Sequence, residues 1–213
     1  MAIIHHTTLK PTKVELLTSW LPTRPWYQGG PATPELTKAG GFRLDDPASE
    51  VGIEFMVATD ASGPAPVAYL VPLTYRGAPL DGAEHALVGT MEHGVLGKRW
   101  AYDGCHDPVL LAELLALIEG RTQAMAQSIT DTPDHEVTRA STAACPSVEG
   151  PLSSVTDTTE STELRVGDGK LVRVHRVLRP TSLSPEGVLG HVTGAWQAAG
   201  DARARAVFVT LHS

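Results

Sequence analysis

The feature that most constrains the fold is the alternation of apolar residues in two neighbouring stretches. In residues 51–57 and 67–73 an apolar residue occupies every second position: Val51, Ile53, Phe55, Val57, then Val67, Tyr69, Val71, Leu73. A repeat of two is typical of a β-strand that packs one face on a core. Gly63-Pro64 between the stretches predicts a hairpin, and residues 95–102 are a third candidate strand.

Two segments predict helices instead. Thr12 followed by Glu15 is a capping-box pattern at a helix start, and the apolar residues after it share one helical face. Asp107 before Pro108 predicts the start of a second helix. Residues 109–118 are apolar nearly all round, so we expect this helix to be buried.

The C-terminal residues are mostly strand-like. Residues 164–166 and 171–177 flank Gly167-Asp168-Gly169, which is a hairpin turn signal, and residues 188–196 and 206–211 are two further candidates. The fold class expected from these patterns is α+β, with antiparallel β-sheets packed with two main helices.

Charge divides the chain into three segments. Residues 1–121 carry a formal charge of −5, residues 122–163 carry −6, and residues 164–213 carry +4. The middle segment is rich in Ser, Thr, Asp and Pro, which is typical of a connector. We therefore expect an α+β module at 1–121, an acidic connector at 122–163 and a β module at 164–213.

Composition excludes several classes. The net charge of −7 argues against a nucleic-acid partner, and no apolar run approaches the roughly 20 residues of a membrane span. No signal-peptide pattern is found at the N-terminus, and Cys105 and Cys145 are too far apart for a CxxC pair. A cytoplasmic location, without a membrane, is the simplest expectation. The 213 residues contain no asparagine.

Three blocks resemble the N-terminal half of bacterial maltokinases. Residues 19–30 resemble the family's W-L-P-x-x-R-W-F-x-G-K-G opening, with an extra Pro25 and without the lysine. Residues 69–73 and 102–108 are similar to the Y-x-V-P-L and Y-D-A-x-x-D-P elements of the family's cap domain. Residues 161–186 resemble the start of a kinase N-lobe. The resemblance implies a cap domain followed by a degenerate N-lobe-like sheet.

Departures from the family pattern bear on activity. The resemblance aligns the family's phosphate-binding lysine with Arg173 and its partner glutamate with Val188. It aligns the Ser-Asn-Thr of the family's phosphate loop with residues 160–162 or nearby, again without the Asn. The sequence contains no His-Gly-Asp catalytic loop, no metal-binding Asp-Phe motif and no Asn to hold a second Mg²⁺. We therefore expect no enzyme activity, no catalytic residue and no cofactor.

Four residues are candidates for a binding site. Arg173 and His175 share one face of a predicted strand and form a small basic stripe, either a solvated edge or a remnant site for an anion or other ligand. Trp20 and Trp26 lie near Gly29-Gly30, where aromatic rings either stack on a sugar or pin a loop to the core.

Other candidates carry weaker patterns. Glu84-His85 and Glu92-His93 do not have the spacing of a metal-binding helix, so we expect no metal site. Cys105 precedes a helix start, where a thiol can be activated, although a structural role is the simpler interpretation. An unrelated enzyme that uses these residues is the least favoured hypothesis.

The leading hypothesis is a non-catalytic relative of maltokinase. The resemblance implies a regulatory or scaffolding role in trehalose, maltose or glycogen metabolism, with a sugar kinase or an α-glucan enzyme as the partner. An N-lobe without a C-lobe leaves an uncovered face, so we expect a protein partner or a homodimer. The alternative is a small-ligand module that binds a sugar or nucleotide in the cleft between the cap and the lobe.

Overall fold

The alternating stretches form strands of one large antiparallel sheet in a computed structural model, which describes all residues except 1–7, 130, 143–149, 168, 199 and 201. The strands are β1 (Leu9–Lys10), β2 (Leu36–Asp45), β3 (Gly52–Asp60), β4 (Val67–Arg76), β5 (Leu87–His93), β6 (Gly97–Asp103), β7 (Thr138–Ser141), β8 (Leu152–Asp157), β9 (Ser161–Val166), β10 (Lys170–His175), β11 (Val177–Leu178), β12 (Gly190–Gln197) and β13 (Arg203–His212). The predicted strands at 51–57, 67–73, 95–102, 164–166, 188–196 and 206–211 are thus confirmed, with shifted ends. The predicted strand 171–177 is instead divided at Arg176 into β10 and β11, which pair with different strands.

Both predicted helices form with the caps expected from the sequence. In α1 (Lys13–Trp20), Thr12 and Glu15 make the capping box, and the 3₁₀ turn η1 (Leu21–Thr23) follows. In α2 (Pro108–Glu119), the Asp107 side chain accepts from the Val109 N–H, and Gly120 ends the helix in the left-handed conformation. Two more 3₁₀ turns are η2 (Glu84–Ala86) and η3 (Gly104–His106). No helix in the described part of the chain is long and apolar enough to cross a membrane.

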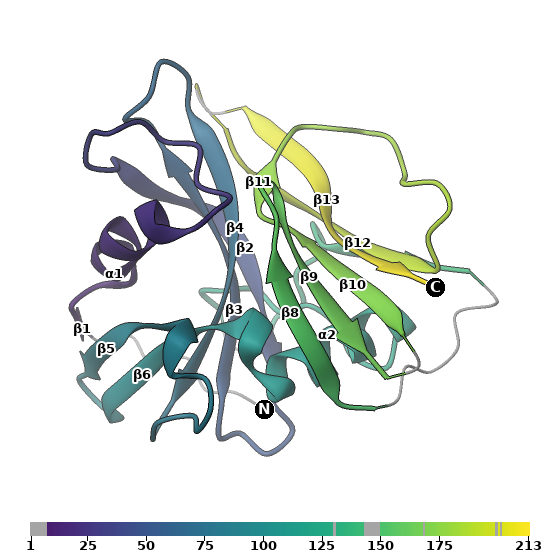
Figure 1. The fold of residues 1–213 in the computed structure, drawn as a ribbon, viewed down its shortest axis with the longest axis horizontal. Coiled ribbons are helices and arrows are strands. Elements are labelled where there is room, and N and C mark those ends of the chain that lie inside the picture. The colour runs from purple at the N-terminus through teal and green to yellow at the C-terminus, as the bar shows by residue number, and fades with distance from the viewer. Residues whose placement is uncertain (1–7, 130, 143–149, 168, 199, 201) are drawn as a thin grey trace.

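The sheet curls until its two halves meet. The strand order is β1-β5-β6-β4-β3-β2-β12-β13-β10-β9-β8, and β7 pairs with β12. β11 follows β10 after a single residue but pairs with β4, where Val177 lies opposite Tyr69. The curl from β4 through β2 and β13 therefore closes on β4 again (Figure 1).

Two apolar cores lie on the two faces of this curl. The inner core contains Phe55 of β3, Phe208 of β13 and most of the buried side chains of α2. The outer core lies between the other face of β3 and β4 and helix α1. Figure 1 shows α1 and α2 on different sides of β3 and β4. Because both faces are covered, Phe55 and Met56 are both fully buried although they are neighbours in β3.

The predominantly β, α+β fold class is confirmed. Strands β7 and β8 lie in the acidic segment 122–163, and Trp196 of β12 pairs with Gly40 of β2, so the sheet is continuous from the N-terminal to the C-terminal segment. The domain boundaries at 121 and 163 stay a prediction. The sequence patterns did not indicate β2, β5, β7 or β8.

Candidate functional site

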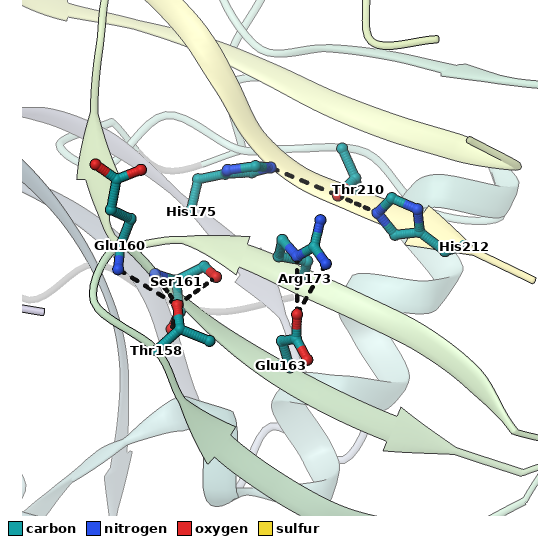
Figure 2. A network of polar contacts seen from close by, with 8 residues as sticks. All are labelled: Thr158, Glu160, Ser161, Glu163, Arg173, His175, Thr210 and His212. Atoms are coloured by element: carbon teal, nitrogen blue, oxygen red, sulfur yellow. Dashed lines mark hydrogen bonds and ion pairs between the residues drawn. The ribbon is translucent and has the colours of Figure 1, made fainter. Parts of the chain in front are cut away.

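The candidate site lies on the face of β10 that points away from the inner core. Val172 and Val174 point into that core, so alternation places Arg173 and His175 on the opposite face. In the register of the sheet, Arg173 lies opposite Glu163 of β9 and opposite Thr210 of β13. We name the group Glu163, Arg173, His175, Thr210 and His212 the β10 face (Figure 2). The stripe predicted from Arg173 and His175 is therefore part of a larger polar cluster.

The Arg173 guanidinium is committed to one neighbour. Its Nε and Nη2 atoms donate to the same oxygen of Glu163, at 3.1 and 2.8 Å. The arginine side chain is 35% exposed and the glutamate 24%. An anionic ligand that approaches Arg173 would therefore meet a positive charge that Glu163 already neutralises.

The two histidines of the β10 face lie on either side of Thr210 (Figure 2). The Thr210 hydroxyl is 2.9 Å from His212 Nε2 and 3.5 Å from His175 Nε2. Burial lowers the pKa of His175 to about 4, and the nearby charges of Arg173 and His212 act in the same direction. Burial and Arg173 also lower the pKa of His212. Both imidazoles are therefore neutral at pH 7.

The turn between β8 and β9 closes on its own side chains. The Thr158 hydroxyl accepts from the backbone N–H groups of Glu160 and Ser161, at 3.3 and 3.0 Å, and donates to the Ser161 carbonyl. The resemblance aligns a kinase phosphate loop here, and such a loop works by pointing free N–H groups at the phosphates. In this turn, those two N–H groups are already bonded (Figure 2).

A negative charge stands at the same turn. The exposed carboxylate of Glu160 accepts from Arg179 Nη2 at 2.6 Å, and this bond and charge lower the pKa of Glu160. The Glu160 carbonyl also accepts from the N–H groups of Arg176 and Val177, which fixes the turn against the junction of β10 and β11. A phosphate at this turn would therefore meet an ion pair, in which Glu160 already neutralises the cation of Arg179.

Trp20 and Trp26 lie in the outer core. Trp26 is fully buried and Trp20 is 6% exposed, and the two rings contact each other edge to face with centroids 5.7 Å apart. Tyr69 also packs on Trp26. This is the arrangement that core packing requires, and rings buried in this way present no open face on which a sugar could stack.

A buried arginine that sequence reasoning missed connects the two halves of the curl. Arg176 is fully buried between β10 and β11, and its Nη2 donates to both carboxylate oxygens of Asp103 at 2.7 and 2.6 Å. Its Nε donates to Thr162, and its guanidinium lies 4.9 Å from the centre of the Trp26 ring. The sequence did contain a signal for this position. Residue 176 continues the alternation of Val172 and Val174, which places it on the same inward face.

The remaining sequence candidates lie apart from the β10 face. His85 Nε2 lies 3.1 Å from His106 Nδ1. His93 Nδ1 instead accepts from the backbone N–H of Val95 in the hairpin between β5 and β6. Cys105 is fully buried, and burial raises the pKa of its thiol well above the ordinary value, which does not favour a reactive thiolate. Within the described residues, no three His, Cys, Asp or Glu side chains are placed to hold a metal ion.

The geometry thus defines an α+β protein whose sheet carries a closed, polar face instead of an open phosphate cradle. Comparison with protein families adds that residues 20–107 match the maltokinase N-terminal cap domain. This segment includes most of the first block of the resemblance and nearly all of the second, which confirms the expected relation to the cap domain. The third block, residues 161–186, lies outside the matched segment. No curated protein matches the chain.

Proposed function

We propose that this protein is a non-catalytic relative of maltokinase that acts as a regulatory or scaffolding partner in trehalose, maltose or glycogen metabolism. The cap-domain match at residues 20–107 supports the relation. The observation that carries the non-catalytic role is the pairing of Arg173 with Glu163. The resemblance implies a lysine that contacts the phosphates at this position. The guanidinium of Arg173 is bonded instead to a carboxylate on the neighbouring strand of the same sheet.

The turn at residues 158–161 supports the same proposal independently. Phosphoryl transfer depends on positioning and on neutralising charge. Here the backbone donors bond Thr158, and the nearby cation Arg179 is bonded to Glu160. A non-catalytic protein acts through a partner protein. We propose that the partner is a sugar kinase, an α-glucan enzyme or a second copy of the chain.

Calorimetric titration with Mg·ATP tests the non-catalytic role. We expect no saturable heat that depends on Arg173, so the wild type and Arg173→Ala should give the same titration. Arg165→Ala is the matched control, because Arg165 is an exposed arginine on the adjacent strand β9. Saturable ATP binding that Arg173→Ala abolishes and Arg165→Ala preserves would contradict the proposal, because Arg173 would then perform the lysine's role.

Sedimentation of the purified protein, alone and mixed with a purified maltokinase, tests the partner role. A complex with the kinase, or a dimer at micromolar concentration, is the expected result. A protein that stays monomeric and does not bind the kinase would contradict both the kinase partner and the dimer. The α-glucan enzyme would be tested in the same way.

The second candidate function is binding of a sugar or nucleotide in the cleft between the cap and the lobe. The polar β10 face favours it, with Arg173 and His175 as the contacting residues. Titration with maltose, trehalose and glucosamine tests it, and an absence of heat for all three removes the sugar form. The burial of Trp20 and Trp26 leaves this function without the stacking rings that were one of the two interpretations of the sequence.

A further inference from the structure

A pocket on the opposite half of the molecule gathers most of the lysines in the chain. It has a volume of about 930 Å³ and lies where β1 and the start of α1 meet β2 and β3. The chain contains five lysines, and three of them, Lys10, Lys13 and Lys38, line this pocket. The lining holds one acidic residue, Glu15, so three ammonium groups face one carboxylate there in a protein of net charge −7.

Two of these lysines are fixed from below by a buried carboxylate. Lys13 Nζ lies 2.5 Å from Glu54 Oε2, and Lys38 Nζ lies 3.5 Å from Glu54 Oε1. Tyr75 and Gln127 also donate to Glu54, at 2.7 and 3.0 Å. Burial by itself raises the pKa of Glu54, but the charges of Lys13 and Lys38 and these bonds outweigh it, so the carboxyl stays ionised.

The third lysine has no such partner. Lys10 is exposed, and no ion pair joins it to an acidic side chain in the described residues. The Lys38 side chain is 41% exposed and only weakly joined to Glu54. Glu15 also lines the pocket, but its carboxylate accepts from the backbone and hydroxyl of Thr12. The ammonium groups of Lys10 and Lys38 therefore keep donors for a ligand.

The rest of the wall is suited to an organic molecule. Leu9, Val14 and Met56 contribute apolar surface to this depression, which is largely open to solvent.

From these observations we infer that this pocket binds a small organic anion, through its phosphate or carboxylate group, with Lys10 and Lys38 as the contacting residues. The site is separate from the β10 face and does not depend on the proposed partner role. Lys13 is not counted among the contacting residues, because Glu54 and the ring of Tyr75 already hold its ammonium group.

The test uses calorimetry on the full chain at constant ionic strength, with pyrophosphate and citrate as separate probes. We expect saturable binding of one or both in the wild type, and the stronger probe distinguishes a phosphate ligand from a carboxylate ligand. Lys10→Ala and Lys38→Ala should each weaken binding by about tenfold, the loss expected for one charged contact. Lys170→Ala is the matched control, because Lys170 lies on β10.

The absence of saturable binding in the wild type, or equal binding by all four proteins, would overturn the inference. Thermal unfolding of each variant verifies that it is folded. Lys13 is not replaced, because its removal would leave the buried charge of Glu54 without its nearest cation. ATP separates this inference from the proposed function. ATP binding that Lys10→Ala weakens and Arg173→Ala leaves unchanged supports the pocket and leaves the β10 face non-catalytic, whereas the reverse pattern contradicts the proposed function alone.

Discussion

At the scale of single residues, Arg176 and Asp103 form a buried ion pair that connects the two halves of the chain. Both side chains are buried, and burial of two charges is tolerated only when their bonds are well formed. Thr162 accepts a further bond from Arg176 and donates to Asp157 at 2.6 Å, so the network extends to β8. Removal of one charge leaves the other without compensation.

We expect Arg176→Leu to lower the free energy of unfolding by about 3–5 kcal/mol, the usual cost of breaking a buried pair from one side. Urea unfolding monitored by tryptophan fluorescence measures this change. Arg179→Leu is the matched control, since the pair of Arg179 with Glu160 is exposed and should contribute less than about 1 kcal/mol. Similar losses in the two variants would contradict the structural role of Arg176.

A second residue, His175, makes stability depend on pH. Its pKa is about 4 in the folded chain, below the ordinary value of 6.5, so the unfolded chain binds the proton more readily between these values. The stabilisation is complete above pH 6.5 and is lost as the pH falls towards 4. We expect His175→Gln to lose about 2 kcal/mol less stability than the wild type between pH 7 and pH 5.

Urea unfolding at the two pH values measures this difference. His135→Gln is the control, because His135 is exposed. The free energy of unfolding of this variant should fall between pH 7 and pH 5 by as much as that of the wild type. If the free energy of unfolding of His175→Gln changes with pH as that of the wild type does, the lowered pKa of His175 is contradicted.

At the scale of elements, local signals predicted some parts of the fold and missed others for identifiable reasons. Asp107-Pro108 and the apolar run after it were sufficient to place α2. The sequence did not indicate that Arg76 donates to Asp107 through two bonds of 2.7 Å, because that contact joins distant segments. β2 was missed because Gly40-Gly41 interrupts its alternation.

Gly41 is required by its neighbours. Its φ is +121°, and a Cβ atom there would lie 2.0 Å from the Phe55 carbonyl oxygen of β3. We expect Gly41→Ala to destabilise the protein by at least about 2 kcal/mol, because the backbone of two strands must move apart. Gly30→Ala is the control, since a Cβ atom at Gly30 meets no atom within 4 Å. Chemical unfolding of both variants measures the difference, and equal stabilities would contradict the close approach of β2 and β3.

At the scale of the whole molecule, the strand order could not be predicted from the sequence. Hairpins such as β3–β4 and β9–β10 follow from neighbouring patterns, whereas the β2–β12 and β4–β11 contacts join residues more than a hundred positions apart. The β10 face was predicted in part, as Arg173 and His175, because alternation is local. Glu163, Thr210 and His212 complete it only through the register of three strands.

The shared inner core leads us to expect one cooperative unfolding transition for the chain. Calorimetry should give equal calorimetric and van't Hoff enthalpies. We also expect a fragment of residues 1–121 to lack a cooperative transition, because it leaves Asp103 and the β4 edge without partners. Two separate transitions would instead support independent modules on either side of the acidic segment.

The closure of the curl on β4 has a consequence for synthesis of the protein on the ribosome. Strands β2 to β6 and α2 emerge first, but Val177 and Leu178, which pair with β4, are made more than fifty residues after α2 ends. Until then the nascent N-terminal half exposes an open strand edge and the uncompensated charge of Asp103. Contacts between such distant positions form slowly, and an exposed edge invites pairing with other chains. We therefore expect the nascent N-terminal half to be open to mispairing with other chains until residues 162–178 have left the ribosome.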